Sequence, residues 1–567
     1  MHKHRSIVGP ATGRPHPERG IALAGVLIFT VISAFFSAAV LHALSVHSRL
    51  VQDKYNYTRA LYLAESGLNR AAEAVWTGYL NANPLPDARI AWLEDHYTDF
   101  DQEDVSIGPD GDTYTVKARR MMTTGEDEER LIVFEAIGNA VGGIEPAERT
   151  ITRVIRYGHD QGSIFDYTYF LNNFGWFYGS SITANGEVRG NGNFEFQSSP
   201  TVNGDVYASI NPDVGAGAPG QILGSYNSWN LSTYRTKAVG KPTWRPTRPE
   251  FEYGYSGEST DFEFQQILEM PYLGDISRFE ALAQQKNGEL TTTASSGPAM
   301  PTHINNVIQG PLFLYGTPTN PIVIDGPVVV RGDVAIAGYV TGQGTIYSDR
   351  NIHVVNDIIY KTPPIYDKSA GANPNTNAAY NQAADFLGLA AKGNIILGDY
   401  TSTDWTGNVA PYIKPPFTKS YTDEDGTRHN GDYTASDGAK SDGTVRKRYE
   451  GTWTNAQFQS MVNLAKSLYS RSDSLPRRID ALGYTNHLYA GRAKDAVWNG
   501  AIMSRDEGIV FNGSVTMNYD YRAKQEGEQY IDIDLPKAAN AEPTIWLEGP
   551  YEQWVSKLDP LDHSLQD

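Results

Sequence analysis

The chain contains no cysteine among its 567 residues. Disulfide frameworks, thiolate zinc sites and cysteine nucleophiles are therefore excluded, and stability has to come from burial and backbone pairing. Charged residues are also sparse, at 20 %, and the net charge is −19. Because binding to phosphates needs clustered lysine and arginine, this acidic composition disfavours a nucleic-acid partner.

Two further absences coincide near the N-terminus. Residues 21–48 contain no aspartate, glutamate, lysine or arginine, and residues 18–83 contain no proline. The run IALAGVLIFTVISAFFSAAVL spans roughly 31 Å as a helix, which matches the hydrocarbon thickness of a bilayer. We therefore expect one transmembrane helix. A cleaved secretory signal peptide is the alternative, with Ser37, Ala39 and Ala43 as the small residues near a cleavage site.

The residues before this run are mainly basic. Lys3, Arg5, Arg14 and Arg19 precede it, with Glu18 as the only acid. The positive-inside rule then leaves the N-terminus in the cytoplasm and sends the rest of the chain outward. The expected topology is a single pass with the body outside.

Beyond the apolar run the sequence keeps a helical pattern. Apolar residues recur at intervals of three and four: Tyr57, Leu61, Ala64, Leu68, Ala72, Val75 and Tyr79. One long helix is predicted, apolar all round in its first half and amphipathic in its second, where it would pack on a globular domain. A plain membrane anchor with a helical stalk would show the same stripe.

Three segments together resemble a known family. They are ERG at Glu18–Gly20, IALAGVLIFTVISAFF after it, and YLAESGLNRAAEA at Tyr62–Ala74. This order is similar to the N-terminus of PilX-type minor pilins and related pseudopilins. The resemblance implies that a prepilin peptidase cuts after Gly20, that Ile21 becomes the new N-terminus, and that the helix then packs in a filament.

One position departs from the family pattern. The family places a glutamate at the fifth residue after the cleavage site, where it pairs with a neighbouring subunit's terminal amine, whereas this chain has Gly25. By resemblance, pseudopilins that lack this acid cap the filament tip. The resemblance also implies packing against other pilin-like subunits through Gly25, Tyr57, Leu61, Ala64 and Leu68.

The remaining sequence favours strands. Between Asp104 and Tyr157, strand-like runs separated by GPDG, GEDEE and GGIEPAE predict a small antiparallel meander, which also resembles the pilin head. Further on, strands of two to four residues alternate with Gly, Asn and Asp steps, as in PIVIDGPVVVRGDVAIAGYV at Pro321–Val340. Such short strands need similar neighbours to stack on, which predicts a β-solenoid or parallel β-helix, with a β-sandwich as the alternative.

The fold class is thus mainly β with a long N-terminal helix. The predicted segments are a basic prepilin-type leader at 1–20, the transmembrane and amphipathic pilin helix at 21–80, the pilin-like β-meander at 81–160, a β-helical body at 161–535 and a C-terminal tail at 536–567. Within the body, 262–286 and 455–469 have helical patterns.

Few residues indicate catalysis. Because β-helices include polysaccharide lyases and hydrolases, Asp325, Asp333, Asp349 and Asp357 are candidate paired acids, with His353 as the one histidine among them. Each lies beside Gly, Asn or Arg at an expected turn, where a short carboxylate caps backbone amides instead. The capping role explains their spacing without chemistry.

Metal and ligand motifs are equally weak. The Gly/Asp-rich loop at 423–442 faintly suggests calcium, but its spacing fails the EF-hand pattern and a solvated loop fits better. No zinc or phosphate-binding motif is present, so no cofactor or metal is predicted. The aromatic run YFLNNFGWFYG at 169–179 could stack on sugars, although core packing explains it as well.

These observations predict a structural subunit and not an enzyme: a minor type IV pilin-like or pseudopilin protein that displays a β-helical head for assembly or adhesion. Its expected partners are other pilin-like subunits, the prepilin peptidase, the inner membrane, and a surface carbohydrate or host ligand. The expected location is the bacterial inner membrane, then the pilus or cell surface. The alternative is a membrane-tethered β-helical carbohydrate-active enzyme or carbohydrate-binding protein.

Overall fold

The computed structural model describes residues 18–563, with longer gaps at 210–219, 225–264, 293–302, 367–377, 411–419 and 431–448 and short breaks elsewhere. The chain forms two compact units. The first contains residues 1–79, 92–156 and 542–567, and the second contains residues 80–91 and 157–541. The chain therefore leaves the first unit, builds the second and returns, so the second unit is an insertion in the first.

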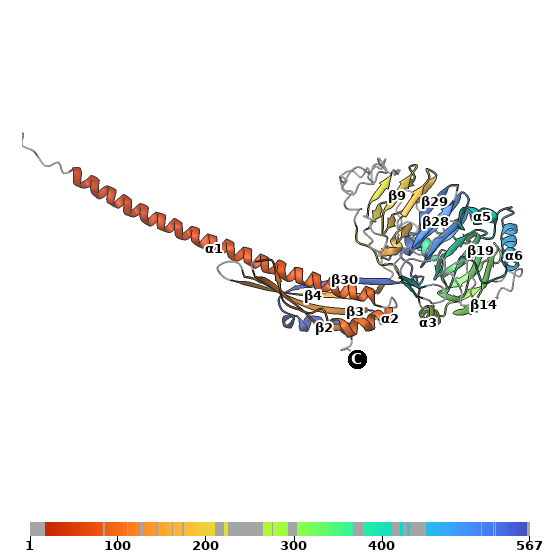
Figure 1. Ribbon diagram of the computed structural model, residues 1–567, viewed down its shortest axis with the longest axis horizontal. Coiled ribbons are helices and arrows are strands. Elements are labelled where there is room, and N and C mark those ends of the chain that lie inside the picture. The colour runs from red at the N-terminus through yellow and green to blue at the C-terminus, as the bar shows by residue number, and fades with distance from the viewer. Residues whose placement is uncertain are drawn as a thin grey trace, which may run out of the picture. The chain divides into compact units, whose positions relative to one another are not determined.

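The first unit begins with one long helix, α1, Glu18–Asn81 (Figure 1). It confirms the expected long N-terminal helix, and no proline interrupts its backbone hydrogen bonds. A second helix, α2, Pro86–His96, follows a short break. Proline at the first helical position costs α2 nothing, because the first backbone amides of a helix have no partner within it.

The C-terminal half of α1 packs on a five-stranded sheet with the strand order β1-β2-β3-β4-β30. The strands are β1 Gln102–Ile107, β2 Asp112–Thr123, β3 Glu129–Ala140, β4 Ala147–Asp160 and β30 Ala538–Glu548. The pairs β1/β2 and β2/β3 are antiparallel, as the sequence predicts for a meander.

The fifth strand, β30, lies in the segment 536–567. The sequence predicts a C-terminal tail there, and the structure corrects this prediction. In the structure β30 lies next to β4, where Gly549 N donates to the carbonyl of Thr150 and Thr544 Oγ1 to that of Val154. Alternation in this strand points Ile545 and Leu547 toward an apolar cluster, while Trp546 is exposed. The same alternation, read in the sequence, is the signal for a strand here.

The last residues also belong to this unit. Short helical turns, η7 Tyr551–Gln553, α7 Val555–Leu558 and η8 Asp559–Leu561, follow β30. Leu558 is buried in the apolar cluster that contains Met122 and Val154. Arg120 donates to Asp559 at 2.6 Å and to Asp562 at 2.7 Å, which fastens the C-terminal segment to β2.

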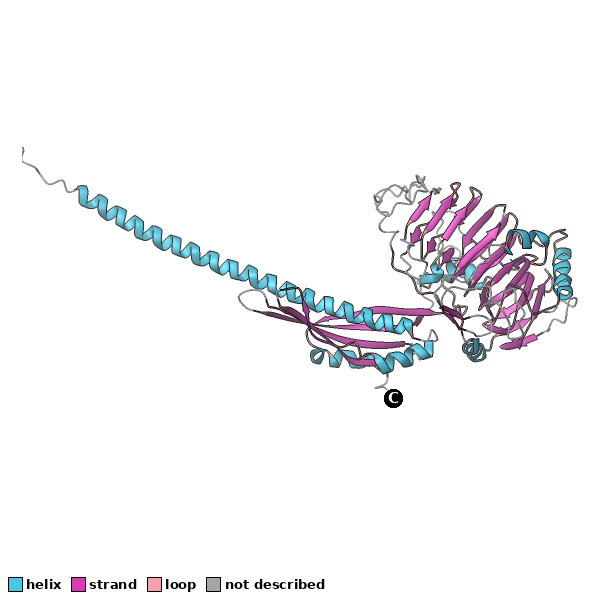
Figure 2. Ribbon diagram, in the orientation of Figure 1, coloured by secondary structure: helices cyan, strands magenta, loops and turns pink. Residues whose placement is uncertain are grey.

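The second unit is built almost entirely from short strands (Figure 2). Its first run comprises β5 Tyr169–Leu171, β6 Gly175–Tyr178, β7 Ile182–Asn185, β8 Val188–Gly190, β9 Phe194–Gln197, β10 Thr201–Val202, β11 Val206–Ala208 and β12 Ile222–Gly224. The second comprises β13 Glu289–Thr291, β14 His303–Asn305, β15 Val307–Gln309, β16 Leu312–Gly316, β17 Ile322–Asp325, β18 Val328–Arg331, β19 Val334–Ser348, β20 Ile352–Tyr360, β21 Phe386–Ala391, β22 Ile395–Leu397, β23 Ser420–Thr422 and β24 Arg428–Asn430. The third comprises β25 Arg478–Thr485, β26 Leu488–Arg492, β27 Ala496–Ser504, β28 Glu507–Phe511 and β29 Val515–Tyr519.

Most neighbouring strands of this unit run parallel. The shortest steps cover 18 or 19 residues, as between Val188 and Val206 or Ile479 and Trp498. Other steps are longer, such as 22 residues from Val307 to Val329 and 43 from Gln343 to Phe386, where extra segments are inserted. The inward side chains, mainly valine, isoleucine and leucine, form one continuous apolar cluster from β5 to β29. Strands too short to be stable alone are thus held by their neighbours on both sides.

The order of the strands in the stack differs from their order in the sequence. The first strands pair with the last: Tyr169 of β5 lies beside Ile502 of β27, and Ile182 of β7 lies beside Val515 of β29. The chain therefore enters and leaves the stack at neighbouring levels. This closeness suits an insertion whose two ends must both connect to adjacent strands, β4 and β30.

The helices of the second unit pack outside the stack. They are α3 Ile276–Lys286, α4 Ala378–Ala383, α5 Thr403–Asn408 and α6 Asn455–Leu468. The helix predicted at 455–469 is present, and Thr454 and Gln457 form a capping box at its start. The prediction of helix over 262–286 holds only from Ile276 onward among the described residues, because Pro271 and Gly274 disfavour helix before that point.

We expect the Gly138→Ala substitution to destabilise the first unit. A Cβ atom at Gly138 on β3 would lie 2.0 Å from the carbonyl oxygen of Ala60 and 2.6 Å from the amide of Ala64, both backbone atoms of α1. Relieving such a clash shifts the helix off the sheet at a cost of about 1–3 kcal/mol. Urea unfolding of the full chain in detergent measures this loss.

Gly407→Ala in α5 is the matched control, because nothing lies within 4 Å of a Cβ atom there. Alanine favours helix over glycine by roughly 1 kcal/mol, so this variant should unfold no earlier than wild type. Equal unfolding midpoints for wild type and Gly138→Ala would show that α1 does not approach β3 this closely.

Candidate functional site

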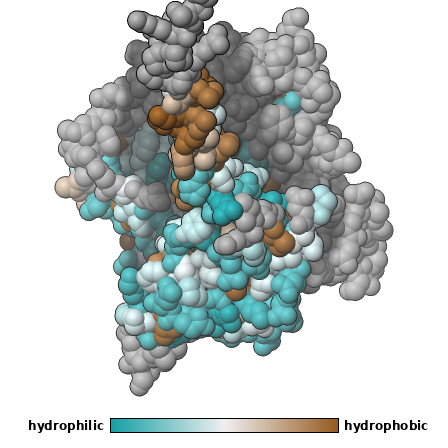
Figure 3. Space-filling view, turned by 90° about the vertical axis from the view of Figure 1, so that its left-hand side faces the viewer, coloured by the Kyte–Doolittle hydropathy of each residue, from teal (hydrophilic) through white to brown (hydrophobic). Residues whose placement is uncertain are grey.

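The N-terminal half of α1 carries a large apolar surface that is exposed in the described part of the structure. Its exposed apolar side chains are Leu23, Val26, Leu27, Ile28, Phe29, Val31, Ile32, Phe35, Phe36, Val40, Leu41, Leu44, Val46, Leu50 and Val51. Four of them are consecutive, so they point to every side of the helix. Figure 3 shows this half in brown. Within residues 18–563 as described, α1 is the one helix long and apolar enough to cross a membrane.

The C-terminal half of α1 is different, because one side of it is buried in the first unit. Ala60, Ala64, Leu68, Ala71, Val75 and Tyr79 are fully buried, at helical steps of three and four. Gly138 allows the helix backbone to approach β3, and Gly67 allows the ring of Tyr114 on β2 to lie directly against the helix. The two halves therefore have different environments along one rod.

Charged residues mark the boundary between the two halves. Arg59 pairs with Asp112 of β2 at 2.5 Å, and the side chain of Asp112 is 3 % exposed. Arg149 of β4 pairs with Glu548 and lies over the ring of Tyr57, with its guanidinium carbon 3.7 Å from the ring centroid. These contacts fix α1 to both β2 and β4 at the point where its exposed apolar surface ends.

The residues that the family resemblance assigns to filament packing differ in how exposed they are. Tyr57 is about half exposed and Leu61 is half-buried, and nothing lies within 4 Å of a Cβ atom placed at Gly25. Ala64 and Leu68 are fully buried under the unit's own sheet. Gly20 and Ile21, the residues assigned to processing, lie in the first turns of α1.

The aspartates considered as paired acids are bound to their surroundings in different ways. Asp333 is buried and accepts hydrogen bonds from the backbone amides of Asn351 and Thr452. Asp357 is buried and accepts from the backbone amides of Arg477 and Arg478. Backbone capping, the alternative to catalysis, therefore describes both.

The two remaining aspartates are not buried, and little of the loop considered for calcium is described by the structure. Asp349 is near the surface and accepts from Lys392 at 3.3 Å, and Asp325 is exposed at the end of β17. Most of the loop at 423–442 lies outside the described residues. In the part of the chain that the structure describes, no three His, Asp or Glu side chains are grouped to hold a metal.

Sequence reasoning missed a chain of amide side chains that runs along the stack. Asn203 donates to Asn185, Asn185 to Asn518, Asn518 to Asn499, and Asn499 to Asp480, each at 2.7 or 2.8 Å. Each side chain accepts from one neighbour and donates to the next, as in other amide ladders. The sequence signal for this ladder is the regular spacing of its asparagines: Asn499 and Asn518 are 19 residues apart, and Asn185 and Asn203 are 18 apart.

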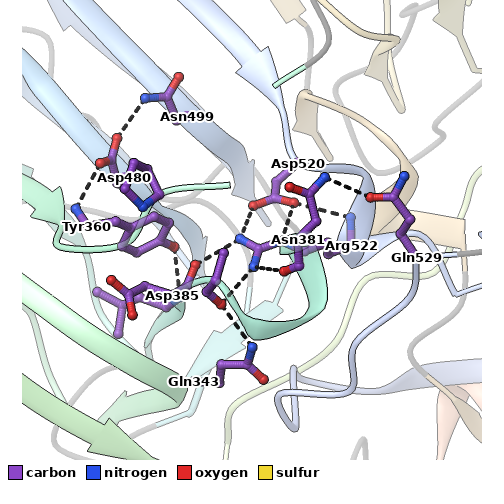
Figure 4. A network of polar contacts seen from close by, with 12 residues as sticks. Gln343, Tyr360, Asn381, Asp385, Asp480, Asn499, Asp520, Arg522 and Gln529 are labelled. Atoms are coloured by element: carbon purple, nitrogen blue, oxygen red, sulfur yellow. Dashed lines mark hydrogen bonds and ion pairs between the residues drawn. The ribbon is translucent and has the colours of Figure 1, made fainter. Parts of the chain in front are cut away.

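This ladder ends at a buried carboxylate (Figure 4). Asp480 also accepts from the backbone amide of Tyr360 at 2.9 Å and from Arg478. Burial raises the pKa of Asp480, and the hydrogen bonds from Arg478 and Asn499 oppose that rise. The bonds from Tyr360 of β20 and Asn499 of β27 connect β25 to its neighbours, whereas the bond from Arg478 lies within β25.

Close to Asp480, Figure 4 shows a second buried centre at Arg522. Its guanidinium donates twice to Asp520 and also to the carbonyls of Asn381, Ala384 and Asp385. All three guanidinium nitrogens are thus used, which offsets the desolvation of the buried pair. The pair fastens the chain after β29 against the corner between α4 and β21.

An aromatic cluster beside α6 contains His353. Its ring lies 5.1 Å from Tyr400, 4.9 Å from Trp453 and 5.9 Å from Phe458, between centroids. Neither ring nitrogen has a hydrogen-bond partner in the described structure, and the residue is fully buried. Burial lowers the pKa of His353 to about 4. The neutral imidazole therefore acts as one more ring of the core.

Comparison with known proteins gives no relative: no protein-family model matches the chain, and neither a curated protein nor a solved structure matches it significantly. Its function therefore has to be argued from its own residues.

Asn499→Ala should destabilise the second unit by about 1–3 kcal/mol, because it removes one hydrogen bond to buried Asp480 and leaves the side-chain amide of Asn518 without its acceptor. Urea unfolding followed by tryptophan fluorescence measures this change. Asn463→Ala is the control, since Asn463 is exposed on α6. Identical unfolding midpoints for the two variants would show that the ladder contributes nothing to stability.

His353 predicts an acid-dependent loss of stability. Its folded-state pKa of about 4 lies below the unfolded value of about 6.5, so the unfolded state binds the extra proton between these values. The stabilisation is complete above about pH 6.5 and decreases by about 3 kcal/mol as the pH falls to about 4. Unfolding free energies measured from pH 7 to pH 4 test this.

The His353→Phe variant keeps a ring in the cluster but cannot take up the proton. Over the same pH range it should lose less unfolding free energy than wild type. If the two proteins lose equal amounts, the pH dependence comes from other groups.

Proposed function

We propose that this chain is a minor type IV pilin-like or pseudopilin structural subunit. The observation that carries the proposal is the division of α1: a half that is apolar and exposed on every side, continuous with a half whose inner side is buried under the unit's own sheet. A rod with these two halves suits a subunit that is stored in a bilayer and then packs among similar rods, while its folded part stays outside.

In the membrane stage, the lipid covers the exposed half of α1. The basic residues before it keep the N-terminus in the cytoplasm, and the sheet of the first unit and the whole second unit lie beyond the bacterial inner membrane. The uncharged run ends before Arg49, where polar groups would meet water again. The charged contacts of Arg59 and Arg149 lie about two to three helical turns further along α1, outside the bilayer.

In the assembly stage, helices of other pilin-like subunits replace the lipid around the same surface. Processing by the prepilin peptidase between Gly20 and Ile21 precedes this step, as the resemblance implies. Tyr57 and Leu61 lie near the C-terminal end of this contact surface. Ala64 and Leu68 are buried and pack on the subunit's own sheet instead. Because Gly25 has no carboxylate to pair with a neighbour's terminal amine, we place the subunit at the tip of the filament, in few copies.

The second unit serves as the displayed head. Its mainly parallel pairing, with several steps of 18 or 19 residues, favours the β-solenoid over the β-sandwich, whose strands are mostly antiparallel. A stacked head presents long ladders of outward side chains at fixed spacing. Such a surface suits adhesion or the guidance of assembly.

Mass spectrometry of the mature N-terminus tests the proposal. In cells that contain a prepilin peptidase, the chain should begin at Ile21, and in cells without one the leader should remain. Gly20→Val should block the cut, because it places a branched side chain beside the cleaved bond. Gly25→Val is the control, since nothing lies within 4 Å of a Cβ atom there.

An intact Met1 in the presence of the peptidase, or a cut after the apolar run, would overturn the assembly role. Immunogold labelling of filaments tests the position, and even labelling along the shaft would contradict the tip.

A further inference from the structure

One outward face of the second unit combines two aromatic rings with polar atoms that have no partner among the described residues. The ring of Tyr178 is exposed, and that of Trp176 is half-buried, because it packs at the edge of the aromatic cluster beside α6. It belongs to the parallel sheet β6-β9-β12. Along β6, Phe177 points into the core, where its ring lies 5.3 Å from that of Phe194. Because successive strand residues point to opposite faces, Trp176 and Tyr178 point outward.

The neighbouring strand completes this face. In the register of the sheet, Trp176 lies beside Glu195, and Tyr178 lies beside Gln197. The rings of Trp176 and Tyr178 are 4.9 Å apart and inclined at 52°. Tyr178 is 46 % exposed, so its ring is open to a ligand. These four residues are called the Trp176 platform below.

The polar atoms of the platform are only partly used by the protein. The hydroxyl of Tyr178 donates to Oε2 of Glu195 at 2.9 Å. Burial, followed by the carboxylate of Glu195, raises the pKa of Tyr178 to about 12, so this hydroxyl stays protonated at neutral pH. Among the described residues nothing bonds to Oε1 of Glu195, the indole N–H of Trp176 or the amide of Gln197. A donor, an acceptor and an amide thus surround the two rings.

This combination excludes several classes of partner. An apolar protein surface would leave Oε1 of Glu195 and the indole N–H of Trp176 buried without hydrogen bonds, which is costly. A nucleic acid or an anionic polysaccharide would be repelled by Glu195 and by the net charge of −19. A ligand that fits has an apolar face to lie on a ring and neutral hydroxyl groups at its edge.

We propose that the Trp176 platform binds a neutral glycan, with a sugar ring stacked on Trp176 or Tyr178 and its hydroxyl groups bonded to Glu195, Gln197 and the indole N–H. The inference deepens the proposed display function and rests on it for its biological role. The aromatic residues of the run at 169–179 then have two roles. Tyr169, Phe170 and Phe177 belong to the core, and Trp176 and Tyr178, on the other side of β6, form the binding face.

Isothermal titration calorimetry on the full chain tests this. The probes are cellohexaose, maltohexaose and chitohexaose, and the chain is held in a detergent without a sugar headgroup. At least one probe should bind wild type. Trp176→Ala and Tyr178→Ala should each weaken that binding about tenfold or more, as expected for an aromatic anchor. Glu195→Gln, which keeps the shape and removes the charge, should weaken it less.

Trp546→Ala is the control, since Trp546 is a tryptophan outside the platform, 49 % exposed on β30. It should bind the probe as wild type does, and circular dichroism should be unchanged for every variant. No binding of any probe at millimolar concentration, or wild-type affinity in folded Trp176→Ala and Tyr178→Ala, would overturn the inference. The mature N-terminus is measured on the same preparation, so a failure of glycan binding is distinguished from a failure of pilin-like processing.

Discussion

The close approach of α1 to β3 is the contact on which the first unit depends. Gly138 has no side chain, so the backbone of Ala60 and Ala64 comes directly against the strand. Small residues on both partners permit a contact that larger ones would prevent, and dispersion forces act at full strength at this distance. The helix is thereby held along one side for about half of its length, and its other half has no packing partner among the residues that the structure describes.

The second unit is stabilised on a different principle. Its strands are too short to fold alone, and each acquires its backbone partners from the levels before and after it. The amide ladder from Asn203 to Asp480 repeats this dependence with side chains. Because the first strands pair with the last, residues more than 300 apart in the sequence stabilise one another.

Much of the local structure could be predicted from the sequence. The missing charges and prolines predicted α1, and the alternation of apolar residues predicted the meander, because both patterns are local and strong. The fate of 536–567 was not predicted, since β30 pairs with a strand far away in the sequence and no local pattern encodes that partner. For the same reason, the pairing of β5 with β27 could not be predicted from the sequence.

The candidate site was predictable to a similar degree. The apolar surface of α1 followed from composition, but the division between buried Ala64 and exposed Tyr57 required the sheet to be in place. The roles of Trp176 and Phe177 depended on which neighbour faced the core, and a one-residue change of register would exchange them. Side-chain direction in short strands is therefore settled by the stack and not by the strand itself.

The insertion of the second unit between β4 and β30 has a consequence for biosynthesis. During synthesis, α1 and the first four strands are made long before their fifth partner, β30. The edge of β4 therefore lacks its neighbour until the whole second unit has been made. Completion of the sheet thus depends on synthesis of every residue between β4 and β30.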